Sequence, residues 1–409
     1  MQFKLLQTYR VLSNFSISLI MEFIPFMIFG FALPVMGMAR AIAMMFGYWV
    51  LQCLFVFIFS TLFQKEFFSK PQIFLLLRVF PIIACEICVL FLPLNSWWIL
   101  IITAIFSGLE NSFNYVPTEI IYNYVSEGQD EKTLGFTRFL EQMGWLIAGI
   151  AGGAFLDFLP QWLVVTFSLA LFVGSAIPLV IFYYKFRKDP TFNKDFVSYA
   201  VAAREKDPKV KKLKKRFLLK HFISLALIAP TVYCFYYLTS AIMYIETGSF
   251  LIAGTVSSVY DGIYGVCCLF AGKLLTKYDG KNLTSFTALY MIVSIFVIYF
   301  VPIMWVKIFV FLLSAIIQPI INIHLFQSYL DKGRILGVGN EVLLNQYRGN
   351  CIGYSLIYIV GMFGMFPIIV ASAGMAFLGV LYERKAEEST TKDLVDFLSF
   401  NETSTEKEN

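Results

Sequence analysis

The chain has 409 residues, of which 58% are hydrophobic and only 14% are charged, and its mean hydropathy is +0.73. Soluble domains hold ~45–50% apolar and ~25% charged residues, so this composition excludes a cytosolic enzyme, a secreted disulfide scaffold and a disordered chain. A polytopic membrane protein remains. The net charge of +5 does not indicate nucleic-acid binding, because most basic residues lie in the gaps between apolar runs.

The apolar runs are long and do not alternate with polar residues, so we predict an all-α integral membrane protein. A membrane helix needs ~20 mainly apolar residues, and the chain offers twelve such runs. The predicted spans are 13–37, 40–63, 72–94, 97–124, 136–158, 161–184, 217–244, 250–275, 283–303, 305–329, 338–362 and 364–383. The first pair is separated by a very short turn near Met38, and the last pair is split around Gly364.

Basic residues gather on one side of this predicted topology. With the N-terminus inside, only Arg40 and Lys307 fall on the outer side, which places both termini in the cytosol. The longest hydrophilic segment then divides the chain into a six-helix bundle (1–185), a basic cytosolic linker (186–216) and a second bundle (217–385). The linker's stretch from Lys209 to Arg216 either lies along anionic headgroups or is a solvated helix. The polar, acidic residues 386–409 are expected to form a disordered cytosolic tail.

The seven cysteines all fall inside apolar runs and lack metal-ligand spacing with the two histidines. We therefore interpret them as small hydrophobic residues and expect neither a metal site nor a cofactor.

The two halves show weak internal symmetry. Ile17-Ser18-Leu19 matches Ile223-Ser224-Leu225, and Gly135, Gln142 and Gly149 match Gly339, Gln346 and Gly353, at offsets of about 205 residues. Two parallel six-helix repeats joined by a basic loop are typical of transporters, with the substrate cavity between the halves near the middle of the membrane.

This layout resembles the major facilitator superfamily. The loop GKLLTKYDGK resembles the family's signature loop G-x-x-x-D-R-x-G-R-K, although Thr276 stands where the aspartate belongs. The segment GIAGG in span five looks like the glycine-rich motif of exporters without its proline. The stretches VSEGQDEKTLGF and HLFQSYLDKGRILG resemble the macrolide-efflux and siderophore-exporter branch. Span four lacks the arginine usual in proton antiporters; Glu110 is the charge there.

The resemblance implies a monomer in a bacterial cytoplasmic membrane that works by alternating access. It also implies that spans 1, 2, 4, 5, 7, 8, 10 and 11 line the cavity, and that the signature-like loop holds the cytosolic gate. The residues of that gate loop are Gly272, Lys277, Asp279, Gly280 and Lys281.

Ionisable residues within the spans are the first functional candidates, because a charge at mid-membrane costs ~2.5–3.5 kcal/mol on insertion scales. Seven stand out: Glu22, Glu86, Glu110, Glu141, Asp261, His324 and Arg348. All except Glu86 fall on cavity-type spans, and Glu86 is expected to be a structural partner. For proton coupling or substrate binding, the main candidates are Glu22, Glu110, Asp261 and Arg348.

Helical spacing adds secondary candidates. Glu341, Asn345 and Arg348 form one polar stripe in span eleven, which either binds an anionic group or packs against the other half. In span four Asn114 shares a face with Glu110.

Three further candidates stand alone. Glu141, three residues after Arg138, favours a gate or a helix-positioning ion pair. His324 can relay protons or simply hold a hydrogen bond, and Tyr236 can stack on a planar substrate or pack among other aromatic residues.

Glu22 is the strongest coupling candidate. No Lys or Arg lies within one helical turn of it, so we expect its partners to come from other helices or water. A carboxyl group at this depth can take up a proton on one side and release it on the other as its exposure alternates. A permanently protonated, structural glutamic acid is the competing interpretation.

We predict a secondary active transporter that moves a small organic solute, by proton-coupled efflux. Proton-coupled uptake of a nutrient or metabolite, and lipid flipping on the same fold, are the alternatives, and a non-transporting receptor stays open. An intramembrane aspartyl protease is disfavoured, because the Tyr260-Asp261 pair lacks a second acid: Asn340 stands in the only echo of G-x-G-D. No Walker-type motif indicates ATP binding.

Overall fold

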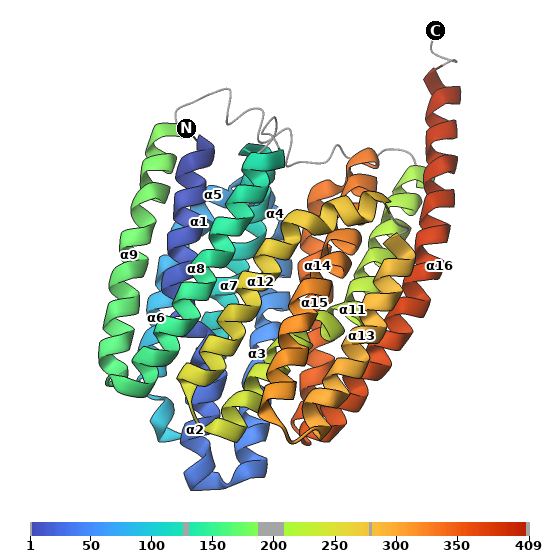
Figure 1. Ribbon diagram of the computed structural model, residues 1–409. Coiled ribbons are helices and arrows are strands. Elements are labelled where there is room, and N and C mark those ends of the chain that lie inside the picture. Colours follow the sequence, from blue (N-terminus) through green and yellow to red (C-terminus); the bar gives the residue numbers. More distant parts are fainter. Residues whose placement is uncertain (1, 126–130, 187–207, 278–279, 406–409) are drawn as a thin grey trace.

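Long helices lying side by side make up the described part of the computed structural model, which covers residues 2–125, 131–186, 208–277 and 280–405 (Figure 1). The first half contains α1 (Gln2–Ser18), η1 (Met21–Phe23), α2 (Ile24–Met36), α3 (Met38–Leu62), α4 (Gln64–Ser69), α5 (Pro71–Leu77), α6 (Val79–Val89), η2 (Leu92–Leu94), α7 (Trp97–Val125), α8 (Glu131–Phe158) and α9 (Gln161–Phe186). The second half contains α11 (Pro208–Thr247), α12 (Phe250–Lys277), α13 (Gly280–Phe300), α14 (Met304–Ile335), α15 (Gly339–Gly361) and α16 (Met365–Thr405).

Helices dominate because a backbone in hydrocarbon must satisfy its own hydrogen bonds. Judged by length and composition alone, ten helical segments of the described chain are long and apolar enough to span a membrane. The more polar α11 and α15 complete the predicted twelve spans within the same bundle. The predicted short turn lies at Gly37, where φ is +79° and a side chain would be strained. The last two spans separate at Gly364, as predicted.

Two spans differ from their predicted form. The first begins at Gln2 rather than at residue 13, and it breaks between α1 and α2 at a single 3-10 turn, η1. Pro25 explains the break, because a proline lacks the N–H that a helix needs and its ring clashes with the carbonyl four residues earlier. The third span is likewise divided, into α5 and α6, at Arg78.

The two halves repeat the same set of helix contacts. In the first half α1 packs on α8 and α9, α3 on α7, and α6 on α7. Six spans later, α11 packs on α15 and α16, α12 on α14, and α13 on α14. The halves meet through two pairs, α8 with α12 and α3 with α15, which the same pseudo-symmetry exchanges. The chain therefore forms two pseudo-symmetric six-helix bundles.

The α8–α12 pair is packed closely enough to require glycine. A Cβ atom on Gly153 would lie 2.5 Å from the carbonyl oxygen of Phe250, and one on Gly149 would overlap the Ser258 side chain. The glycines of GIAGG therefore permit close helix packing, and their partner is α12 of the other half.

An aromatic layer joins the halves near the end of the bundle away from the termini. Phe26 stacks on Tyr244 with ring centroids 5.5 Å apart, and Trp49 stacks on Tyr358 at 5.0 Å. Each ring pair takes one member from α2 or α3 and the other from α11 or α15. Aromatic pairs of this kind contribute ~0.5–1.5 kcal/mol beyond their buried area.

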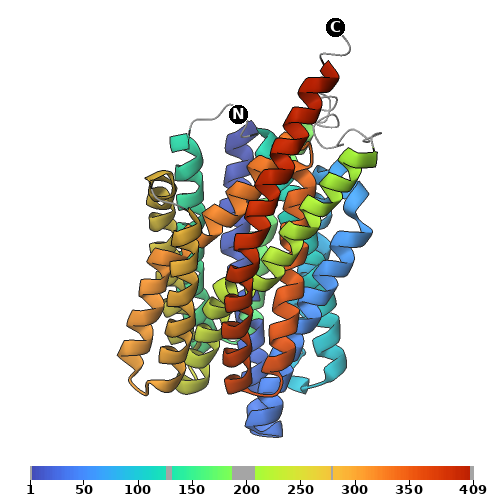
Figure 2. The same ribbon diagram turned by 90° about the vertical axis from the view of Figure 1, so that its right-hand side faces the viewer.

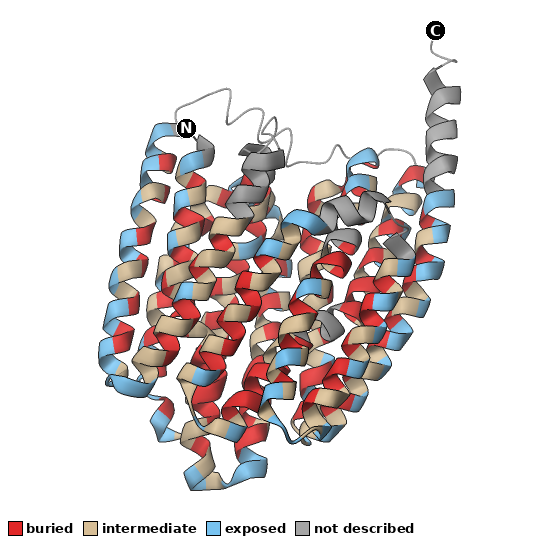
Figure 3. Ribbon diagram, viewed as in Figure 1, coloured by how far each residue is buried: buried red, intermediate tan, exposed pale blue. Residues whose placement is uncertain are grey.

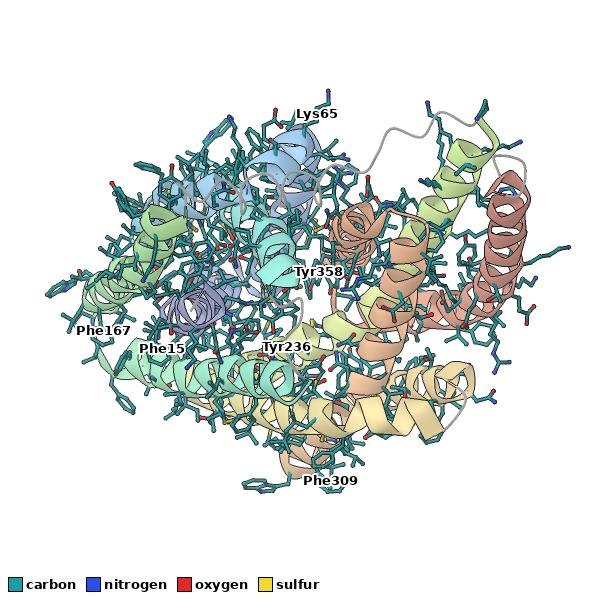
Figure 4. All side chains as sticks on the ribbon, turned by 90° about the horizontal axis from the view of Figure 1, so that it is seen from above. Phe15, Lys65, Phe167, Tyr236, Phe309 and Tyr358 are labelled. Carbon is teal, nitrogen blue, oxygen red and sulfur yellow. The ribbon has the colours of Figure 1, made fainter. Side chains whose placement is uncertain are left out.

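Buried and exposed positions alternate around the helices (Figure 3), and many of the exposed side chains are large and apolar. Trp305 and Phe309, for example, are 79% and 66% exposed, as expected of side chains that face lipid. Figure 4 looks down the bundle: Phe167 and Phe309 lie at its rim, whereas Tyr236 and Tyr358 lie near its middle.

The last helix differs from the expected disordered tail. α16 continues to Thr405 and rises past the other helices at the end that carries both termini (Figure 2). Its extension is held by Lys220, which donates to Ser389 at 2.7 Å, and by Lys332, which pairs with Glu387 at 3.7 Å. The prediction of disorder was based on the polar and acidic composition of the tail, which gives no information about either contact.

Candidate functional site

Asp261 and Tyr236 form a buried polar contact in the second half, beside its interface with the first. Tyr236 lies in α11 and Asp261 in α12, each eleven residues from the turn between Thr247 and Phe250. At ~1.5 Å per residue this is a depth of about 16 Å, near the middle of a ~30 Å hydrocarbon core. The Tyr236 hydroxyl group donates to Asp261 Oδ2 at 2.9 Å.

Glu22 approaches this contact from the first half. It lies in η1, where the helix break caused by Pro25 interrupts the regular backbone ladder. The Ser18 side chain hydrogen-bonds Glu22, so its first partner comes from its own span, contrary to the sequence expectation. The Glu22 and Asp261 carboxyl groups are close enough to interact electrostatically, and Glu22 also interacts with Tyr236 and Tyr237. Carboxyl groups from both halves therefore meet at mid-depth.

Tyrosine rings of α11 and α12 lie beside this carboxyl pair. The ring of Tyr236 lies 5.2 Å from that of Tyr237 and 5.3 Å from that of Tyr260, both in T-shaped geometry. In α15, Tyr354 and Tyr358 stack with centroids 6.1 Å apart. Such walls can hold a planar or cationic group by stacking and cation–π attraction.

Glu110, the third main candidate, is neutralised within the first half. Its carboxylate lies 2.6 Å from Nη2 of Arg78, and both side chains are buried. The Arg78 guanidinium also donates to Tyr9 Oη at 3.1 Å and to Ser13 Oγ at 2.7 Å. The sequence interpretation missed Arg78, although it is the only Lys or Arg inside predicted span 72–94.

A second ion-pair cluster joins α1, α7 and α8. Arg10 Nε lies 2.8 Å from Glu141 and Nη2 lies 3.0 Å from Glu119, while the guanidinium sits 4.5 Å above the Tyr122 ring. Arg10 precedes the first predicted span (13–37), and it is only 7% exposed. Glu141 is thus a helix-positioning ion-pair residue with a partner on α1; the Arg138 side chain falls outside the described residues.

These two clusters border a cavity of about 130 Å³ between α1, α7 and α8. Its lining residues include Asn114, a secondary candidate, which accepts a hydrogen bond from Thr118 at 3.2 Å. All the lining residues belong to the first half: Tyr9, Arg10, Ser13, Asn14, Arg78, Asn114, Tyr115, Thr118, Glu119, Glu141, Gln142 and Trp145.

The polar stripe of α15 contacts two different helices. Arg348 donates across the interface to the Ser60 carbonyl oxygen at 2.7 Å and to Gln64 Oε1 at 3.0 Å, at the end of α3. Asn345 donates to the Leu218 carbonyl oxygen of α11 at 3.2 Å. Glu341 is half-buried at the start of α15 and lies near Lys214. Arg348 therefore links the halves at the end that carries the termini.

A carboxylate links the halves at the opposite end. Asp157, at the end of α8, accepts hydrogen bonds from Ser249 Oγ at 2.7 Å and from the backbone N–H groups of Phe250 and Leu251 at 3.0 and 2.9 Å. It caps the N-terminus of α12, a helix of the other half. The sequence analysis missed this contact, because a capping residue is usually sought directly before the helix that it caps.

The structure describes only some of the remaining candidate residues. Glu86 accepts a hydrogen bond from Ser168 of α9 at 2.8 Å, so it has a partner on a neighbouring helix. Of the gate-loop residues, Gly272 and Lys277 lie in the last turns of α12, Gly280 and Lys281 begin α13, and Asp279 lies outside the described residues. The side chains of Lys277, Lys281 and His324 also lie outside the described part. Within the described residues, no group of three or more His, Cys, Asp and Glu is placed to hold a metal ion.

Comparisons with known proteins identify the family and the fold of the chain. A family model described as Major Facilitator Superfamily matches residues 9–342. A comparison with curated protein sequences finds no match. The solved structures that resemble the chain include a bacterial homologue of the iron transporter ferroportin in its outward-facing state (TM-score 0.65, 12% identity, covering 95% of this chain and 100% of that one).

Two others resemble it as well. The inward-facing state of a bacterial ferroportin homologue has a TM-score of 0.65 at 14% identity, covering 94% of this chain and 98% of that one. A POT family transporter in complex with a thioalcohol-conjugated peptide has a TM-score of 0.65 at 14% identity, covering 95% and 96%. At these identities the likeness shows the fold alone.

Proposed function

Because this chain belongs to the major facilitator superfamily, we propose that it is a secondary active transporter that moves a small organic solute by proton-coupled efflux. Family membership supports membrane transport and a small-molecule substrate. Proton coupling, direction and substrate form the proposal.

One observation carries the coupling. Glu22 and Asp261 come from different halves and approach each other at mid-depth, with Tyr236 bonded to Asp261. Two carboxylates in a poorly solvated site repel each other, so a proton on one of them favours the arrangement with the halves together. Separation of the halves removes that advantage. Uptake and release of a proton are thereby linked to movement of the halves.

Efflux is the proposed direction because VSEGQDEKTLGF and HLFQSYLDKGRILG resemble exporters. Proton-coupled uptake and lipid flipping remain the alternatives. Both termini are placed in the cytosol by the distribution of Lys and Arg, and the basic stretch Lys209–Arg216 is placed against anionic headgroups. The functional unit is proposed to be a monomer. Its first bundle ends at about residue 185, its linker at about 216 and its second bundle at about 385.

The test uses the purified full chain in proteoliposomes with an imposed pH gradient. A panel of labelled amino acids, nucleosides, organic cations and organic acids is offered with the gradient in either orientation. We expect at least one solute to move against its concentration gradient, in the direction opposite to proton flow. Movement with the protons would support uptake, and movement of fluorescent lipids alone would support flipping. No gradient-driven movement of any of these would contradict proton-coupled transport.

A further inference from the structure

The cavity of the first half lies apart from the Glu22–Asp261 pair, and no step of the proposed coupling uses it. It measures about 130 Å³ and is lined by residues of α1, α7 and α8 and by Arg78. An engineered cavity of ~150 Å³ holds one benzene molecule, so this space suits a molecule of about six non-hydrogen atoms. The lining is polar, unlike the walls of an empty apolar void.

Three lining residues carry buried polar atoms that have no hydrogen-bond partner among the described residues. These atoms are Nη1 of Arg10, Nε1 of Trp145 and Oε1 of Gln142. Arg10 is more than nine-tenths buried. A buried, unsatisfied donor or acceptor costs ~1–3 kcal/mol, and more when it is charged, so these atoms point to a missing occupant.

The chemistry of that occupant follows from the unpaired atoms and the charges beside them. The two donors, one of them cationic, require an acceptor such as a carboxylate. The single acceptor, together with the carboxylates of Glu119 and Glu141, suits an ammonium group.

The charges beside the cavity agree with this. Arg78 is already paired with Glu110, so Arg10 is the cation left to the lining, and it faces the carboxylates of Glu119 and Glu141. A ligand that carries both signs can place its carboxylate against the unpaired donors and its ammonium group beside these carboxylates.

We propose that this cavity binds a small zwitterionic amino acid, with its carboxylate toward Arg10 and Trp145 and its ammonium group toward Gln142 and Glu141. The proposal rests on the proposed transport function in one respect: it names the solute class as amino acids of about the size of alanine. All the residues that line the site belong to the first half.

Binding is measured on the purified full chain by scintillation proximity with tritiated L-alanine. Ethylamine and propionate, which are alanine without its carboxylate and without its amine, serve as competitors. We expect saturable binding of alanine and at least tenfold weaker competition by either fragment. Trp145→Phe and Gln142→Leu each remove one unpaired group and should weaken binding about tenfold, ~1.4 kcal/mol. Trp162→Phe, an exposed tryptophan of α9, is the matched control and should bind as the parent does.

The outcomes separate this inference from the proposed function. Absence of saturable alanine binding by a protein whose thermal unfolding is normal would overturn the inference, as would unchanged affinity in both cavity variants. Ethylamine competing as well as alanine would also overturn it, since the site would then take amines. Glu22→Gln should keep alanine binding, because Glu22 does not line the cavity; gradient-driven transport tests the proposed function separately.

Discussion

Tyr236 donates a 2.9 Å hydrogen bond to Asp261, and both residues belong to the second half. Glu22, whose charge interacts with that of Asp261, belongs to the first. A rigid-body movement of one half against the other therefore changes the distance between the carboxyl groups and leaves the tyrosine contact intact. Tyr236 fixes one carboxyl group while the other approaches or departs.

The Arg78–Glu110 pair should be essential for stability. Both side chains are buried, so removing one partner leaves an uncompensated charge, which in soluble proteins costs about 3–5 kcal/mol. We expect Arg78→Met to unfold at a clearly lower temperature in detergent. Replacing both partners, Arg78→Met with Glu110→Leu, should recover part of the loss. If the double variant is no more stable than Arg78→Met, the pair is not the reason for the defect.

Asp157 should hold the halves together at the end away from the termini. An N-cap contributes about 1 kcal/mol, equivalent to a factor of about five in a two-state equilibrium. We therefore expect Asp157→Ala to speed maleimide labelling of a cysteine at Ala253, a buried position of α12, several-fold in a cysteine-free background. Asp157→Asn keeps an acceptor oxygen and should label more slowly than Asp157→Ala. Equal labelling of Asp157→Ala and its parent would exclude this role.

Arg348 is proposed to bind substrate, and in this structure it is bonded to α3. Once the panel assay has identified a solute, Arg348→Lys should weaken its binding, because an ammonium group lacks the planar fork of guanidinium. Gln64→Ala removes one partner, at the start of α4, without touching the charge, and should leave affinity unchanged. If the two variants behave alike, Arg348 serves only to link the halves.

Cys53 of α3 and Cys351 of α15 should report directly on the interface between the halves. Their thiols are close enough to interact electrostatically, and α3 packs on α15. Copper-phenanthroline should therefore cross-link them. With a protease site placed in the 187–207 segment, the cleaved halves should migrate together on a non-reducing gel and separate after reduction. Cys53→Ser is the control and should never show the joined species. Halves that always separate would contradict the α3–α15 contact.

The sequence predicted the architecture well because lipid imposes a strong and local rule. Each span must be apolar over ~20 residues, and Lys and Arg avoid the translocated side. The number of spans and their orientation can therefore be predicted from the order of residues along the chain. The break at Pro25 and the split of 72–94 at Arg78 carried local signals that were overlooked.

The pairing of charges could not be predicted in the same way. Arg10 meets Glu119 and Glu141, which lie more than a hundred residues away, and Asp157 caps a helix of the other half. Such contacts depend on how helices pack, and no spacing rule within one helix describes them. Depth in the membrane selected Glu22 and Asp261 as candidates, but only the structure brings them together.

The most direct test of the central claim compares Glu22→Gln with its parent in proteoliposomes, using the solute that the panel identifies. Glutamine keeps the hydrogen-bonding shape of a protonated glutamic acid but cannot exchange a proton. The account predicts that Glu22→Gln loses transport driven by the pH gradient while solute exchange without a gradient continues. Full pH-driven transport by Glu22→Gln would contradict the account and remove Glu22 from the coupling mechanism.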